Sequence, residues 1–300
     1  MIAGLLRYVE IKTKITSVFP FMMILGYLLY KGQTIDIRRT LIFFVGMFIF
    51  DLTTTAINNY IDTKTNEQIL PVNRQKALAI IFMLFAISLT FGVWLVLLTD
   101  IVVLIIGGIC FICGVLYTYG PIPISRQPLG EIVSGIFYGL LIPFILLYIN
   151  MPQGYFLSYE LSINVIEVKF YVMPIVTILI LSVNPVCCTA NIMLANNICD
   201  LEKDVKVNRF TLPYYLKEKA LILFAWLYYI TYPATALMVA LKILHPLCLL
   251  SILTIIPVHK NVKIFLLKQD KDTTFLTSIK NYVIIMGSLT LTIFIGSLMN

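Results

Sequence analysis

Charged residues are scarce in this sequence: they make up 12% of the 300 residues, whereas hydrophobic residues make up 60%. A water-soluble domain of this length needs far more charge on its surface, so the composition excludes that class of protein. Histidine is almost missing, with two residues, and Cys110 and Cys113 form a C-x-x-C pair without a second pair or a nearby histidine. A zinc or redox centre built on thiols is therefore not expected.

The sequence also has no polar region large enough for a soluble domain. Its apolar residues form blocks long enough to cross a hydrocarbon layer of about 30 Å, which takes about 20 helical residues. The blocks lack the period-two alternation of a membrane barrel. We predict an all-α integral membrane protein with about nine transmembrane helices in one bundle, as a single domain over residues 1–300. The blocks lie near 15–31, 39–58, 77–98, 101–119, 130–149, 171–196, 219–240, 243–257 and 281–299. If the short eighth block joins the seventh, the number is eight.

Lysine and arginine are distributed unevenly between the segments that join these blocks. With nine spans and an internal N-terminus, one side holds 17 of the 22, and the other side holds only Lys31, Arg38, Arg39, Lys169 and Lys242. Positive residues collect on the cytoplasmic side of a membrane. We therefore predict a multi-pass protein of the cell membrane with a cytoplasmic N-terminus. The net charge of +7 then reflects topology and attraction to anionic lipid, and it implies no nucleic acid and no protein partner.

Two polar stretches follow apolar blocks at a constant offset of 138 residues: NNYIDTKTN at 58–66 and NNICDLEKD at 196–204. One such stretch alone would be an ordinary helix cap or interfacial turn. Two copies on the cytoplasmic side favour a shared site. At 100° per residue the polar residues of each stretch fall on one helix face, within about 80° for the first, and Asp51 lies on that face deeper in the helix.

Hard oxygen ligands on two facing helices suit a magnesium-bridged diphosphate, because Mg²⁺ is commonly held by one or two carboxylates together with phosphate oxygens. We expect Asp62, Asp200 and Asp204 to be the catalytic carboxylates. Basic residues nearby would balance the remaining phosphate charge. The expected metal ligands are Asn58, Asp62, Asn66, Asn196, Asp200 and Asp204, and the expected diphosphate-binding cations are Lys64, Arg74, Lys206 and Arg209.

These motifs resemble the UbiA superfamily of intramembrane aromatic prenyltransferases, which has aspartate-rich motifs after its second and sixth of nine helices. The stretch YTYGPIPISRQPLGE at 117–131 and the pair Asn196–Asn197 are similar to the branch that acts on 1,4-dihydroxy-2-naphthoate. The resemblance implies Mg²⁺-dependent transfer of a polyprenyl group from a prenyl diphosphate to an aromatic acceptor, in menaquinone or demethylmenaquinone biosynthesis. It implies an active site that opens toward the cytoplasm.

The sequence departs from that pattern in its first motif, where Asn59 and Asn66 stand at positions usually held by aspartate. The segment 67–76 is shorter than usual and lacks the G-P-x-R piece, and Arg74 is aligned with its arginine. A trimmed but active metal site is the preferred interpretation. A degenerate, non-catalytic paralogue and a multi-helix membrane transporter are the alternatives, although transporter sites usually lie near the midplane of the membrane.

The substrate pocket is expected to include Asp51, Tyr117, Tyr119 and Asn191. Polar groups at membrane depth usually face a cavity or a partner, which favours this role for Asp51 and Asn191. Tyr117 and Tyr119 either shield a carbocation with their rings or belong to an interfacial aromatic belt, and the sequence leaves both readings open.

Overall fold

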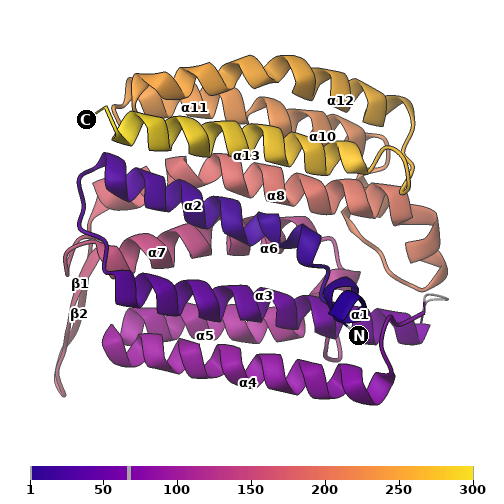
Figure 1. The fold of residues 1–300 in the computed structure, drawn as a ribbon, viewed down its shortest axis with the longest axis horizontal. Coiled ribbons are helices and arrows are strands. Elements are labelled where there is room, and N and C mark those ends of the chain that lie inside the picture. Colours follow the sequence, from indigo (N-terminus) through magenta and orange to yellow (C-terminus); the bar gives the residue numbers. More distant parts are fainter. Residues whose placement is uncertain (1, 66–68, 300) are drawn as a thin grey trace.

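The computed structural model describes residues 2–65 and 69–299, which form a bundle of long helices lying side by side (Figure 1). The hairpin strands and the C-terminus lie at one end of the bundle, and α1 lies at the other. The helices are α1 Ile2–Tyr8, α2 Ile15–Tyr30, α3 Ile37–Thr65, α4 Arg74–Leu98, α5 Ile101–Leu116, α6 Gly130–Ile136, α7 Ile142–Asn150, α8 Val172–Lys206, α9 Leu212–Leu216, α10 Lys219–Tyr229, α11 Thr231–Ala240, α12 Ile255–Leu267 and α13 Leu276–Ser297.

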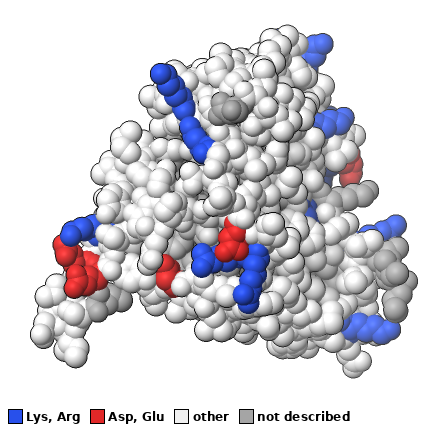
Figure 2. Space-filling view, turned by 60° about the vertical axis from the view of Figure 1, so that its left-hand side comes forward, with Lys and Arg blue, Asp and Glu red and all other residues white. Residues whose placement is uncertain are grey.

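Seven helical segments among the described residues are long and apolar enough to cross a membrane: 37–64, 74–98, 130–150, 172–206, 219–240, 246–267 and 276–297. The apolar helices α2 and α5 are shorter, with 16 residues each. The predicted number of about nine spans is therefore not confirmed, although each of the nine predicted blocks is helical. Figure 2, in which the hairpin end comes forward, shows a surface with few charged residues, as a membrane-embedded bundle requires.

The described part of both polar stretches forms the last turns of helices, where the sequence predicts them to lie. Helix α3 has 29 residues and α8 has 35, which corresponds to about 44 Å and about 52 Å at 1.5 Å per residue. Both exceed a hydrocarbon thickness of about 30 Å, so their polar last turns extend beyond it without leaving the helical conformation. Asp62, Asp200 and Asp204 are thereby held on rigid backbone. Asn66 lies outside the described residues.

The prediction of an all-α protein is wrong for the segment between α7 and α8. Strands β1 Leu157–Leu161 and β2 Ile166–Phe170 pair antiparallel, with Tyr159 opposite Val168. The alternation of polar with aromatic or aliphatic residues in LSYEL and IEVKF favours strands, but the segment lies between the apolar blocks 130–149 and 171–196 and was expected only to connect two helices. The hairpin projects from the end of the bundle opposite α1 (Figure 1), far from the polar stretches.

Helices α6 and α8 approach each other closely where a π-helical turn, Phe137–Leu141, follows α6 and faces Pro185 inside α8. A Cβ atom at Gly139 would lie 2.5 Å from Val186 Cα and 2.6 Å from Pro185 C. Backbone atoms cannot move aside as a flexible side chain can. Only glycine therefore permits this contact, which holds α8 against the helix that precedes the hairpin.

Gly139→Ala should lower the stability of the folded protein in detergent by about 1–3 kcal/mol, the usual cost of overpacking a filled interior. Thermal unfolding followed by intrinsic fluorescence measures the effect. Gly108→Ala is the matched control, because no heavy atom lies within 4 Å of the Cβ that it would add. Equal midpoints for the two variants would contradict the close approach of α6 and α8.

Candidate active site

A single arginine links the carboxylates of the two polar stretches. Arg209 Nη1 lies 3.9 Å from Asp62 Oδ2, and Arg209 Nε lies 3.7 Å from Asp204 Oδ2. Asp62 comes from α3 and Asp204 from α8, so the fold brings together two residues that are 142 positions apart in the chain. The two polar stretches therefore meet at one place in the fold, as the sequence predicts.

The loop after α8 is shaped to place Arg209. Asn208 adopts a left-handed backbone conformation with φ of 56°, which asparagine tolerates better than most residues. The chain then turns back, and Arg209 N donates to the carbonyl oxygen of Asp204 at 2.9 Å. Arg209 Nε also donates to the carbonyl oxygen of Ser125, at 2.9 Å, in the loop between α5 and α6. Arg209 therefore ties that loop to the carboxylates of α3 and α8.

Asp200 has a different cationic partner, Lys271. The Lys271 ammonium lies 2.5 Å from Asp200 Oδ2 and also donates to Asn196 Oδ1. Lys271 belongs to the loop between α12 and α13, which lies at the α1 end of the bundle, as does the loop after α8 (Figure 1). Asn196 and Asp200 are one helical turn apart and share this cation, so their side chains lie on one face of α8. The lysine that contacts it was not predicted.

Three of the four predicted diphosphate-binding cations lie away from these contacts in the described part of the chain. Arg74 donates to the carbonyl oxygens of Tyr60 and Thr63, at 3.3 and 2.8 Å, and so satisfies the last turns of α3. Lys64 lies over the ring of Tyr60, 4.9 Å from its centroid. Lys206 is exposed near the end of α8. Arg126, which was not singled out, lies within electrostatic range of Asp62 instead.

Asn58 and Asn59, the asparagines of the first stretch that the structure describes, both form hydrogen bonds within the protein. Asn58 Oδ1 accepts a hydrogen bond from Thr118 Oγ1 at 3.0 Å. Asn59 Nδ2 donates to the carbonyl oxygen of Tyr8, at 2.8 Å, and to Glu10 Oε1, at 3.2 Å. Asn59 therefore attaches the N-terminal segment to α3. This asparagine has a structural role at a position where the prenyltransferases that the sequence resembles usually have aspartate.

A cavity of about 520 Å³ begins one helical turn away from the carboxylates. Asn58 and Asn196 line it, and each precedes an aspartate of the site, Asp62 or Asp200, by four residues. The rest of its wall is mostly apolar and comes from α3, α4, α5, α6, α8 and the π-helical turn. Among its apolar lining residues are Phe43, Phe50, Phe91, Leu95, Val103 and Phe111. The end of the cavity beside the carboxylates is therefore polar and is called its mouth, and most of the remaining wall is apolar.

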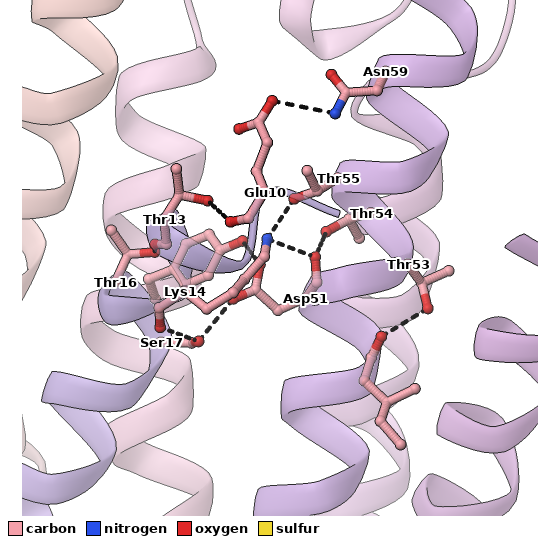
Figure 3. A network of polar contacts seen from close by, with 12 residues as sticks. Glu10, Thr13, Lys14, Thr16, Ser17, Asp51, Thr53, Thr54, Thr55 and Asn59 are labelled. Atoms are coloured by element: carbon pink, nitrogen blue, oxygen red, sulfur yellow. Dashed lines mark hydrogen bonds and ion pairs between the residues drawn. The ribbon is translucent and has the colours of Figure 1, made fainter. Parts of the chain in front are cut away.

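Asp51 lines this cavity, as predicted, but it is paired with a buried lysine (Figure 3). Lys14 Nζ lies 2.8 Å from Asp51 Oδ1, and the exposed fractions of Lys14 and Asp51 are 3% and 5%. Ser17 Oγ donates to Asp51 Oδ2 at 2.7 Å, and the Tyr138 hydroxyl donates to Asp51 Oδ1 at 2.8 Å. Lys14 also donates to Thr55 Oγ1 at 2.5 Å. The carboxylate of Asp51 is thus fully hydrogen-bonded within the wall of the cavity.

The other three predicted pocket residues have different outcomes. Tyr117 lines the cavity, and its hydroxyl donates to Met193 Sδ at 3.6 Å. Tyr119 is 64% exposed and outside the cavity lining, so its assignment to the pocket is wrong. Asn191 is fully buried and donates to the carbonyl oxygen of Phe224 at 2.7 Å. Its predicted place in the pocket is also wrong, because it joins α8 to α10.

The donor set suits a magnesium ion that shares its ligands with a phosphate. No three His, Cys, Asp or Glu side chains in the described ranges gather closely enough to hold a metal alone. Mg²⁺ does not need such a cage, since it retains waters and takes phosphate oxygens. Asp204 Oδ2 is buried and accepts no hydrogen bond from the described residues. That oxygen is therefore available for coordination, and the carboxylates of Asp200 and Asp62 lie within electrostatic range of it.

The sequence matches the model of the UbiA prenyltransferase family over residues 18–282. It is 29% identical over 138 residues to a 1,4-dihydroxy-2-naphthoate octaprenyltransferase of Bacillus subtilis (strain 168), a match that covers 46% of this chain and 38% of that relative. The chain thus spans well under two thirds of that relative in the alignment.

Solved structures share the fold over nearly the whole chain. A digeranylgeranylglyceryl phosphate synthase has a TM-score of 0.65 at 20% identity, covering 100% of this chain and 99% of that one. A UbiA homolog from Aeropyrum pernix K1 has a TM-score of 0.64 at 14% identity, covering 95% and 98%. A UbiA homolog from Archaeoglobus fulgidus bound to DMAPP and Mg²⁺ has a TM-score of 0.61 at 15% identity, covering 99% and 100%. With the family model matching most of its length, this chain belongs to the UbiA prenyltransferase family.

Proposed function

We propose that the protein transfers a polyprenyl group from a prenyl diphosphate to an aromatic quinone precursor, 1,4-dihydroxy-2-naphthoate, in menaquinone or demethylmenaquinone biosynthesis. The observation that carries this proposal is the link that Arg209 makes between Asp62 and Asp204 beside the mouth of an apolar cavity. The activity of the Bacillus relative supports the acceptor, and the ligands of the archaeal homolog support the diphosphate and Mg²⁺. The site would open toward the cytoplasm from the cell membrane.

The carboxylates of Asp62, Asp200 and Asp204 would hold Mg²⁺, with the amide oxygen of Asn196 beside them. When bound, the ion neutralises charge that develops on the leaving diphosphate. Arg209 is placed to grip two diphosphate oxygens, because its planar fork offers two parallel N–H groups. Cations that are already in place stabilise the negative charge that develops in the transition state, and this electrostatic stabilisation is usually the largest contribution to the rate.

The prenyl tail would lie in the apolar cavity, with its allylic carbon near the polar mouth. The phenyl rings and Tyr117 in the cavity wall exclude water and present π-faces that stabilise a carbocation. The ring of the acceptor must reach the same carbon, so the acceptor would enter the part of the cavity lined by Asn58 and Asn196. The tail and the acceptor would thus enter one continuous space.

Purified protein, radiolabelled prenyl diphosphate and a panel of aromatic acceptors test this proposal. We expect a prenylated naphthoate product that requires Mg²⁺ and disappears when EDTA is added. Prenyl diphosphate accumulating unchanged inside proteoliposomes would favour a transporter. A protein that binds prenyl diphosphate and Mg²⁺ but yields no product with any acceptor would be a non-catalytic paralogue.

Arg209→Lys should raise the KM for prenyl diphosphate about tenfold, since a lysine offers one point charge in place of two parallel donors and loses the bond to Ser125 O. Steady-state kinetics with varied diphosphate measures the change. Lys219→Ala is the matched control, because Lys219 is an exposed cation at the start of α10. Equal KM values in the two variants would mean that Arg209 contributes only general positive charge.

A further inference from the structure

The contacts of Lys271 differ in kind from those of Arg209. The Arg209 guanidinium lies 3.7 Å from the Asp204 carboxylate and 3.9 Å from the Asp62 carboxylate, and its Nε–H donates to the carbonyl oxygen of Ser125. Lys271 instead donates directly to Asp200 Oδ2, at 2.5 Å, and to Asn196 Oδ1. Both of these oxygens belong to the predicted metal-ligand set. The ammonium group therefore occupies the position from which a cation would bind this face of α8.

The loop that carries Lys271 is held in shape by its own hydrogen bonds. Asp270 Oδ1 accepts from Thr273 N, at 2.9 Å, and from Thr273 Oγ1, at 2.6 Å. Asp270 N donates to Thr274 Oγ1 at 2.9 Å, and the Asp270 carbonyl oxygen accepts from Thr274 N and Phe275 N. The bonds from Thr273 hold the pKa of Asp270 below its ordinary value, so its carboxylate stays ionised. The turn thus presents Lys271 to α8 from a fixed backbone.

A divalent ion bound to the same two oxygens as the ammonium group would bring two positive charges almost into contact, so the two cations compete for these oxygens. We propose that Lys271 is an intramolecular competitor of the divalent cation at Asn196 and Asp200, and that it must leave these oxygens before the ion binds there. This inference rests on the proposed metal site. Lys271 is 35% exposed at its side chain, so its flexible stem has room to swing away.

The competition has a consequence for substrate binding. A displaced ammonium group beside the carboxylates is within reach of a diphosphate that the ion holds, and it would add a phosphate contact there. Diphosphate then favours metal binding by giving Lys271 a new partner, and by reciprocity metal favours diphosphate binding. The free enzyme would hold its ion weakly at this pair of ligands, and the complex with diphosphate would hold it tightly.

The test measures Mn²⁺ binding to purified protein by electron paramagnetic resonance, without substrate, since Mn²⁺ prefers the same oxygen ligands as Mg²⁺. Lys271→Met should lower the Mn²⁺ Kd about tenfold, which corresponds to about 1.4 kcal/mol. Lys268→Met is the matched control: Lys268 lies in the same loop and pairs with Asp270 at 3.7 Å. It should leave the Kd within about twofold, because general loss of positive charge is a weak effect at an exposed position.

A double-mutant cycle separates direct competition from long-range electrostatics. In an Asp200→Asn background, Lys271→Met should change the Mn²⁺ Kd by less than about twofold, because the contested carboxylate is gone. The same tenfold change in that background, or an unchanged Kd for Lys271→Met alone, would overturn the competition while leaving the metal site intact. Failure of both the unmodified protein and Lys271→Met to bind Mn²⁺ would overturn the metal site itself, and the inference with it.

Discussion

Asp62→Asn should reduce prenyl transfer by at least about 100-fold while leaving the protein folded, because it removes the only carboxylate that the described part of the first polar stretch contributes to the site. The isosteric amide keeps the shape of the side chain but loses its charge, so both the ion and Arg209 lose a counter-charge. Initial rates at saturating Mg²⁺ and prenyl diphosphate measure the loss. Asp200→Asn and Asp204→Asn should have effects of similar size.

Glu202→Gln is the matched control for these variants. Glu202 lies on α8 between Asp200 and Asp204, but its side chain is exposed. Its substitution should leave the rate within about twofold, as exposed charges usually contribute little. An unchanged transfer rate for Asp62→Asn would show that Asp62 of α3 is not a metal ligand. The proposed site would then have carboxylates from α8 only.

Lys14→Met should lower the stability of the folded protein by about 3–5 kcal/mol, because it leaves the carboxylate of Asp51 buried without its counter-ion. Both side chains of this ion pair are buried, and Ser17 also donates to the Asp51 carboxylate (Figure 3). The hydroxyl of Tyr138 is a further donor to this carboxylate. The midpoint of thermal unfolding in detergent should fall by roughly 5–10 °C.

The double variant Lys14→Met with Asp51→Asn should recover most of that loss. The amide oxygen of the asparagine still accepts from one of the two hydroxyls of Ser17 and Tyr138, and the substitution leaves no unpaired charge in the wall of the cavity. A double variant no more stable than Lys14→Met would show that the lysine acts through its packing and not through the ion pair.

Helical membrane segments and the pairing of two polar stretches were predictable from the sequence because they depend on local information. Apolar blocks of about 20 residues determine where helices cross a membrane. The constant offset between Asp62 and Asp200 predicted that both stretches leave the bundle at the same end, and Arg209 now joins Asp62 to Asp204 there. Arg209 was predictable because it follows the second stretch directly.

Lys14 and Lys271 were not predictable as partners of the site, because their roles arise from tertiary packing. Lys14 precedes the first apolar block and is one of the 17 basic residues on the side predicted to be cytoplasmic, and Lys271 lies 71 positions from Asp200 in the chain. The hairpin was missed because its strands lie within a polar connection. Asn191 was misassigned since a buried amide serves equally well as a bond to a neighbouring helix or as a ligand to substrate, and the sequence alone does not distinguish them.

An experimental structure of the protein with Mg²⁺ and a non-reactive prenyl thiodiphosphate tests the central claim most directly. We predict that the diphosphate lies between Asp62 of α3 and Asp200 with Asp204 of α8, that Arg209 contacts it, and that the prenyl tail fills the cavity lined by Phe50 and Phe111. A diphosphate bound instead at Lys64 and Arg74, with the tail outside that cavity, would contradict the account.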